Sequence, residues 1–354
     1  MRAVLISVLA LALMVLFAPV RDATKVTEVG AGGLGSEPMG DPADRPTVRA
    51  MVLGKVRRAP VRKSPPLIRP AVKVPQPKTS LAQTRAALRT QLIADFNTPG
   101  PPPEPPAGVF ERITYPSQVG DLSAYLTPLP DRGKHPAVIW LGGGDTNTIG
   151  DVWSDQPAEK DMTGAAFRRA GVTMMVPSLR GANGNPGRKE MNLGEVDDVL
   201  AAADFLAAQP TIDPKRIYLV GYSTGGGLAL LTSESTDRFR AVFCFGPVWD
   251  VRDYRERQPY DQANQTENRP RSPGYWLEDV RSPTWVIEGG DANTAPTIRR
   301  MRKATKNPMV YALIVAGRNH FSQLDPVNRH IASDILLDPG TGVYRGSLPE
   351  LPRG

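Results

Sequence analysis

Cysteine and histidine are scarce in this sequence, and the scarcity of cysteine excludes some kinds of site. The 354 residues contain one cysteine and three histidines. A single cysteine excludes an intrachain disulfide and a metal site built from several cysteines. Because Cys244 lies in the apolar run Ala241-Val-Phe-Cys-Phe245, it is predicted to be a buried structural thiol.

The folded part of the chain also lacks a net charge, although the formal charge of the whole chain is +7. Between Pro38 and Pro106 there are 12 Lys and Arg against 4 Asp and Glu, whereas from Ala107 onward the counts are 28 and 29. Phe96 is the one aromatic residue in the basic stretch, so there is no series of rings on which bases could stack. Nucleic-acid binding is therefore not expected, and a solvated linker near an anionic surface accounts for the charge.

The first 22 residues are predicted to be a signal peptide or an N-terminal membrane anchor. A basic Arg2 precedes an apolar run that continues to Ala18. The run is long for a signal core and short for a membrane span, and Leu16-Phe-Ala18 is a mediocre cleavage site, so both readings stay open. Either one places the protein outside the cytoplasm, in the periplasm, secreted or tethered to a membrane.

Residues 23–106 are expected to form a disordered linker. The stretch from Gly30 to Pro106 holds 15 of the 36 prolines and little periodic hydrophobicity, so it cannot bury enough apolar surface to offset its chain entropy. Ser80–Ile93 is an exception within it, because its leucines have helical spacing. The last residues, 341–354, are predicted to be a tail.

Short apolar segments alternate with amphipathic segments over residues 107–340. A hairpin is expected from Val109–Tyr115 and Leu122–Thr127, and six further strands are expected between Ala137 and Val315, with helices between them. Such alternation predicts an α/β domain with a mostly parallel sheet and helices on both faces.

Gly221-Tyr-Ser-Thr-Gly225 is the motif most informative about chemistry. The apolar strand Ile217–Val220 leads into it and a helix-forming segment follows, which is the setting of a nucleophile elbow. Ser223 is therefore the candidate nucleophile, placed at a helix N-terminus that favours a developing anion. Two backbone amides should bind that anion, one from Thr224 and one from Gly142 or Gly143 in the run after Leu141.

A serine nucleophile needs a base, and His320 is the candidate. It follows the last strand and lies after the serine in the chain, whereas His135 lies upstream and His330 falls within the last helix, where a surface position is expected. For the acid that orients the histidine, Asp291 is the first choice, because it follows the strand Thr284–Glu288. Asp250 is the alternative, and Glu288 ends its strand too early to extend outward comfortably.

The segments Glu195–Gly227 and Val176–Gly187 resemble the catalytic domain of the prolyl oligopeptidase family and its relatives, the dienelactone hydrolases and acetyl esterases. The resemblance implies an α/β-hydrolase fold and hydrolysis of ester or amide bonds through an acyl-enzyme, with no metal or organic cofactor. The peptidases carry a β-propeller ahead of this domain, which the low-complexity leader cannot form. An esterase acting on a small-molecule ester is therefore favoured over a peptidase acting on a short peptide.

Two further questions stay open at this point. Trp249–Val280 contains Tyr254, Tyr260, Tyr275 and Trp276 in addition to Trp249, so it is either a substrate lid or an ordinary surface loop. A catalytically inactive binding protein on the same fold is the third reading of the chain, because fold alone does not establish activity.

Overall fold

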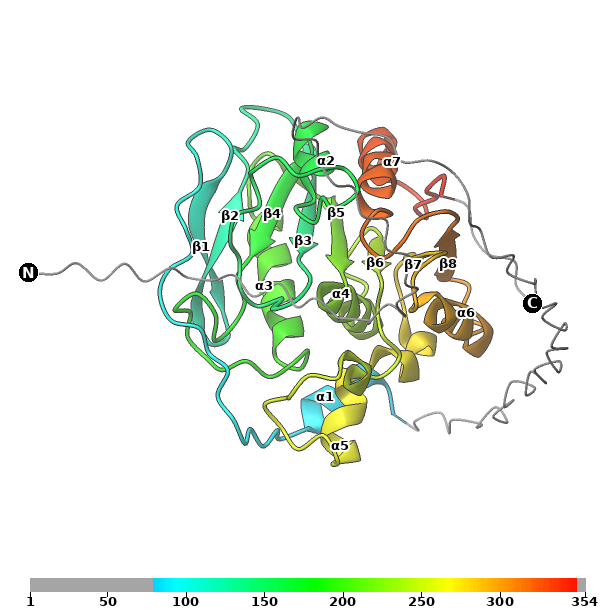
Figure 1. Ribbon diagram of the computed structural model, residues 1–354. Helices are drawn as coiled ribbons and strands as arrows, with labels where there is room; N and C mark the ends of the chain where they lie inside the picture. The colour runs from blue at the N-terminus through cyan, green and yellow to red at the C-terminus, as the bar shows by residue number, and fades with distance from the viewer. Residues whose placement is uncertain (1–78, 349–354) are drawn as a thin grey trace, which may run out of the picture. The chain divides into compact units, whose positions relative to one another are not determined.

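The computed structural model describes residues 79–348, and these contain one eight-stranded sheet (Figure 1). The strand order is β1-β2-β4-β3-β5-β6-β7-β8, in which β2 runs antiparallel to both neighbours and the remaining pairs are parallel. The mostly parallel sheet is thus confirmed. The strands are β1 (Glu111–Ser117), β2 (Gly120–Leu126), β3 (His135–Leu141), β4 (Thr173–Pro177), β5 (Ile212–Tyr222), β6 (Val242–Phe245), β7 (Thr284–Gly289) and β8 (Val310–Val315).

Helices cover both faces of the sheet, as expected. One face packs against α3 (Glu195–Ala207), α4 (Thr224–Ser235) and α6 (Ala295–Ala304), with α1 (Leu81–Ala87) lying outside α4, and the other face packs against α2 (Ala165–Arg169) and α7 (Leu324–Leu337). The central strands are buried on both sides, which explains why β3 and β6 are apolar runs rather than alternating patterns. Helix α4 is buried almost all round, because it lies at the centre of one layer.

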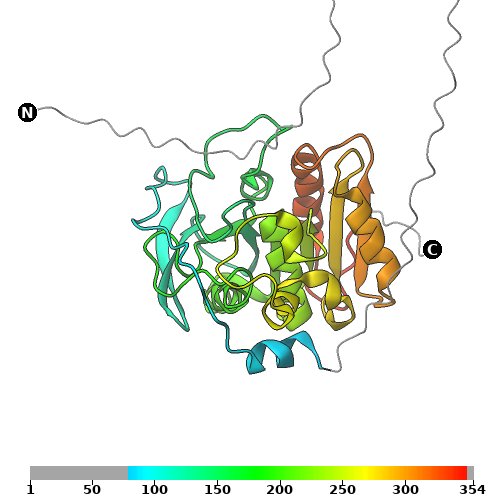
Figure 2. The same cartoon turned by 60° about the horizontal axis from the view of Figure 1, so that its bottom comes forward.

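The prediction of a disordered linker over residues 23–106 is wrong for its final part, residues 79–106, which we call the strap, although the helical exception expected within Ser80–Ile93 is present as α1. The strap begins with α1, which Ser80 and Gln83 close with a capping box. The side chain of Leu81 is fully buried in the core, and Arg85 Nη2 lies 3.1 Å from Asp197 Oδ1 on α3. Figures 1 and 2 show α1 beside the turns around α5 (Gln265–Asn268).

Beyond α1 the strap stays attached by backbone hydrogen bonds. The amide of Ile93 donates to Pro259 O at 2.7 Å, and that of Thr98 donates to Gly181 O at 2.9 Å. These partners are remote in sequence, so a linker-like composition gives no sign of them. The rest of the predicted linker and the N-terminal 22 residues lie outside the described residues.

Two other segments pack more closely than their sequences indicate. Tyr344, in the predicted tail, is 3% exposed and packs edge-on against Trp285, so the tail prediction is wrong for residues 341–348. Trp249–Val280 is a chain of short helical turns whose aromatic residues Tyr260 and Trp276 are buried. These turns are α5 and the 3₁₀ segments Val251–Tyr254, Arg269–Arg271, Pro273–Tyr275 and Leu277–Asp279. Tyr260 and Trp276 serve packing and do not line a lid.

Within residues 79–348, none of the helices combines the length and the apolar character needed to span a membrane.

The strap is expected to stabilise the domain through Leu81. Replacing this side chain by Ala leaves a cavity in the core, so Leu81→Ala should lower the free energy of unfolding by about 2–4 kcal/mol. Ile93→Ala is the matched control, because the Ile93 side chain is 67% exposed and its removal creates no cavity. Chemical denaturation of the two variants measures the difference; equal stability would show that the strap is not part of the cooperative unit.

Candidate active site

Ser223 lies in a sharp turn between β5 and α4 and has a strained backbone, with φ 57° and ψ −116°. Such a conformation is costly for a residue with a Cβ and persists only where the surroundings enforce it. Here the Ser223 amide donates to Phe245 O at 2.7 Å, and the glycines on either side allow close packing. A Cβ at Gly225 would lie 2.4 Å from Leu141 O. The turn therefore has the backbone geometry that the motif predicts for a nucleophile elbow.

His320 lies in the loop after β8, and its Nδ1 is 2.9 Å from Glu288 Oε2. The ring of Tyr222, next to the serine in sequence, has its centroid 4.9 Å from that of the imidazole. With Nδ1 occupied, Nε2 is the ring nitrogen left for proton transfer. Among the described residues no hydrogen bond joins it to Ser223 Oγ, a contact that in substrate-free enzymes is often long and tightens on binding.

The acidic partner of His320 in the structure is Glu288, which corrects the choice of Asp291. Asp291 is exposed, and its backbone amide donates to Arg318 O at 2.9 Å. The loop after β8 packs closely on β7, since a Cβ at Gly289 would lie 2.4 Å from Arg318 O. This approach brings His320 down to the end of the strand, so Glu288 does not need to extend outward.

The alternative acid, Asp250, has other partners. Its oxygens accept hydrogen bonds from Arg252 at 2.8 and 2.9 Å and from Tyr275 Oη at 2.9 Å. Burial raises the pKa of this carboxyl group, but the hydrogen bonds outweigh that effect and hold the pKa below its ordinary value. Asp250 therefore stabilises the Trp249–Val280 segment as a permanent anion.

The other two histidines lie away from this site. His135 begins β3, and its Nε2 is 2.8 Å from Arg132 O. His330 is exposed on α7, as predicted, with Nε2 2.6 Å from Ser347 Oγ. Within residues 79–348, no three His, Cys, Asp or Glu side chains are grouped so that they could hold a metal ion.

The glycine run after β3 lies directly beside the serine. A Cβ at Gly143 would be 3.0 Å from Ser223 Cβ, whereas one at Gly142 would meet no atom within 4 Å. No hydrogen bond links the amides of Gly143 and Thr224 to another residue of the described part of the chain. Both are available to a substrate oxygen, and of the two predicted glycines Gly143 is the nearer to the nucleophile.

Hydroxyl groups hold this glycine run in place. Thr224 Oγ1 donates to Gly144 O at 2.8 Å, and Thr146 Oγ1 donates to Thr224 Oγ1 at 2.6 Å. Thr224 thus ties the loop to α4 through its side chain while its amide stays free. The sequence predicts a role only for the amide of Thr224, so this side-chain contact is an addition to it.

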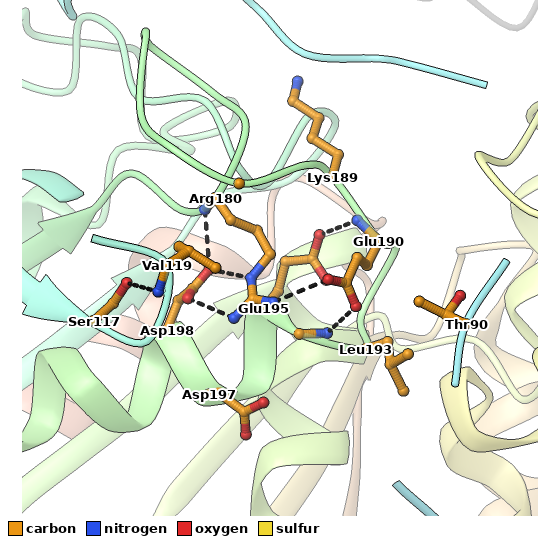
Figure 3. Close-up of polar contacts among 12 residues, drawn as sticks. Thr90, Ser117, Val119, Arg180, Lys189, Glu190, Leu193, Glu195, Asp197 and Asp198 are labelled. Carbon is orange, nitrogen blue, oxygen red and sulfur yellow. Dashed lines mark hydrogen bonds and ion pairs between the residues drawn. The ribbon is translucent and has the colours of Figure 1, made fainter. Parts of the chain in front are cut away.

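A buried charge network anchors the far end of the same loop (Figure 3). Arg180 binds Asp198 with two hydrogen bonds of 2.9 Å and Glu190 with one of 3.0 Å. Its carbonyl accepts a 2.8 Å hydrogen bond from Asn147 Nδ2, which also donates to Glu195 Oε1. The arginine of the Arg-Gly segment therefore positions the glycine loop indirectly and lies in the interior of the protein.

Gly246, at the end of β6, is a required residue that the sequence analysis missed. It has φ +59°, and a Cβ there would lie 2.4 Å from His320 Cε1 and 3.1 Å from Glu288 Oε2. The signal available in the sequence is a glycine directly after an apolar strand, at the edge where the other site residues gather.

Gly246→Ala should therefore displace the imidazole and lower any serine-dependent hydrolysis by about a hundredfold or more, because small misplacements of catalytic groups are costly. Gly317→Ala is the control, since Gly317 has φ +65° and open space around it. Reaction rates of both variants with a fluorophosphonate probe measure the effect; equal rates would contradict the close packing at Gly246.

Comparison with known proteins agrees with this geometry. Residues 161–282 match the model of the prolyl oligopeptidase family, a segment that contains Ser223 and ends before Glu288. An uncharacterized peptidase of Bacillus subtilis is 23% identical over 190 residues, covering 50% of this chain and 71% of the relative. An uncharacterized protein of Mycobacterium tuberculosis is 25% identical over 236 residues, covering 61% of this chain and 76% of the relative.

A puromycin-hydrolyzing peptidase of Mycobacterium tuberculosis has a similar fold, with a TM-score of 0.52 at 18% identity. The likeness covers 64% of this chain but 40% of that peptidase, so the chain spans well under half of its length. The chain therefore has the fold of the α/β hydrolases, and its central segment is similar to the prolyl oligopeptidase family.

Proposed function

We propose that the chain hydrolyses carboxylic esters through an acyl-enzyme, with Ser223 as nucleophile, His320 as general base and Glu288 as the acid that orients it. The observation that carries the proposal is the His320–Glu288 contact of 2.9 Å, one loop away from a serine in a strained elbow. A histidine held through Nδ1 presents Nε2 to its other neighbours, which is the arrangement a serine nucleophile needs.

In the first half of the reaction, His320 Nε2 accepts the proton of Ser223 Oγ as the oxygen attacks the substrate carbonyl carbon. The carbonyl oxygen becomes negatively charged, and the amides of Thr224 and Gly143 donate hydrogen bonds to it. The N-terminus of α4 adds a favourable dipole at the same point. When the tetrahedral intermediate collapses, the imidazolium returns its proton to the leaving alcohol.

In the second half, water attacks the acyl-serine while His320 accepts one of its protons. Collapse releases the carboxylic acid and returns the proton to Ser223 Oγ. The Glu288 carboxylate accepts a hydrogen bond from His320 Nδ1 and stabilises the imidazolium that forms twice in each cycle. Every proton in the scheme passes through one nitrogen, so the fixed orientation of His320 decides the rate.

A peptidase is the second candidate, and the match to the prolyl oligopeptidase family favours it. The same groups cleave an amide by the same steps, with an amine as leaving group. We favour an ester because the strap, the part of the chain that leads into the domain, is a short helix and extended segments packed on the domain. It forms no separate module that would select peptides.

The test uses the full-length protein, wild type beside Ser223→Ala. Wild type should react with a fluorophosphonate probe and turn over short-chain p-nitrophenyl esters faster than a peptide anilide, and the variant should do neither. A higher kcat/KM for the anilide would support the peptidase. A folded wild type that neither labels nor turns over would contradict both proposals and support the inactive binding protein.

The acid is tested by a matched pair of amide substitutions. Glu288→Gln should lower kcat by about a hundred- to ten-thousand-fold, because a neutral amide cannot stabilise the imidazolium. Asp291→Asn should leave kcat within about twofold, since that carboxylate is exposed and no contact joins it to His320 among the described residues. The reverse result would restore Asp291 as the acid.

A further inference from the structure

Glu288 is a carboxylate taken fully out of water. Its side chain is 0% exposed, near the end of β7, which lies between β6 and the edge strand β8. A buried carboxylate loses its hydration, so its charged form survives only if protein groups replace the lost hydrogen bonds. Ser223 and His320 alone do not supply enough hydrogen bonds to replace the lost hydration of Glu288.

Four donors surround the two oxygens of Glu288. Oε1 accepts from the Gly289 amide at 2.8 Å and from Gln323 Nε2 at 2.5 Å. Oε2 accepts from His320 Nδ1 at 2.9 Å and from the hydroxyl of Thr294. His320 is the one member of this set that can carry a positive charge, and it is neutral whenever it acts as a base.

Thr294 and Gln323 occupy the same kind of position in two different helices. Thr294 is the N-cap of α6 and Gln323 is the N-cap of α7, and neither side chain caps its own helix. A threonine at an N-cap ordinarily accepts a hydrogen bond from the first helical turn. Both side chains instead donate to Glu288 and leave their own helices uncapped. Such departures from local sequence preference are typical of functional sites.

We propose that Thr294 and Gln323 are positioning residues, which fix the Glu288 carboxylate in the orientation that meets His320 Nδ1. They act from opposite sides, one on each oxygen, so the carboxylate cannot rotate about its axis without breaking a hydrogen bond. The N-termini of α6 and α7 add the positive ends of two helix dipoles near the same charge. This inference rests on the proposed function and adds two residues to it.

The ionisable groups near Glu288 are neutral, exposed or paired elsewhere, so these hydrogen bonds are its main polar interactions. From β5, Tyr222 faces Glu288, and burial followed by the charge of Glu288 raises the pKa of this phenol, so it stays neutral. In the loops after β7 and β8, Asp291 and Arg318 are exposed and screened by solvent. On α7, Asp325 is paired with Arg329, at 2.9 Å between Oδ2 and Nε.

Loss of one donor should change the pH dependence of the reaction. A carboxylate with fewer hydrogen bonds takes up a proton more readily, and the reaction requires it ionised. Because His320 must be neutral to accept the serine proton, the acidic limb of the kcat/KM profile reports the coupled His320–Glu288 pair, and this limb should move to higher pH. KM should change little, because neither side chain reaches the substrate.

The experiment compares three single variants of the full-length protein, assayed with a p-nitrophenyl ester across a range of pH. Thr294→Val, which removes the hydroxyl, should lower kcat about ten- to a hundredfold and move the acidic limb up by about 0.5–1 pH unit. Thr294→Ser restores the hydroxyl and should recover most of both effects. Thr297→Val is the matched control on the same helix, with a side chain outside the network, and should behave as wild type.

Gln323→Met supplies a second, independent measurement should Thr294→Val fail to fold, and the same upward shift is expected from it. A Thr294→Val or Gln323→Met enzyme with an unchanged pH profile would overturn the inference, even if kcat fell, because a merely structural role lowers the rate at every pH alike. Ser223→Ala separates this outcome from failure of the proposed function. If that variant keeps full activity, the triad itself is refuted.

Discussion

The strained backbone at Ser223 is the constraint on which the rest of the site depends. Holding a non-glycine residue at φ 57° and ψ −116° costs about 1–3 kcal/mol of conformational free energy. The conformation persists only where surrounding contacts enforce it. Glycine on either side of it lets α4 approach the ends of β3 and β6 closely. A Cβ at Gly226 would lie 2.3 Å from Phe245 O, so larger residues would force the helix away. The helix cannot approach without the glycines, and the serine cannot be held without the helix.

The sequence allowed the fold to be predicted and two residues of the candidate site to be selected, for physical reasons. Buried strands and amphipathic helices leave a periodic pattern, so the order of elements and the elbow at Ser223 could be inferred locally. His320 followed from the rule that catalytic groups gather where parallel strands end. Both inferences needed only residues close together in sequence, or a rule that applies to every parallel sheet.

The contact between His320 and Glu288 could not be predicted, because it depends on a loop that folds back. The sequence around Glu288 indicates only where its own strand ends. The contact with His320 depends instead on the loop Arg318–His320, which packs onto Gly289. The strap was missed for a similar reason. Thr90 and Arg271 are 181 residues apart, and their hydrogen bond of 2.7 Å has no counterpart in composition. Contacts of this kind are set by tertiary packing and leave no local pattern.

Cys244 can report on local opening of the sheet. It is the single cysteine of the chain, lies on β6 between β5 and β7, and is 0% exposed. Burial raises the pKa of its thiol, so the reactive thiolate is suppressed as long as the sheet stays closed. The rate at which a thiol reagent modifies Cys244 therefore measures how often the sheet opens around β6, which lies beside the strand that leads into Ser223. No cysteine has to be introduced for this measurement.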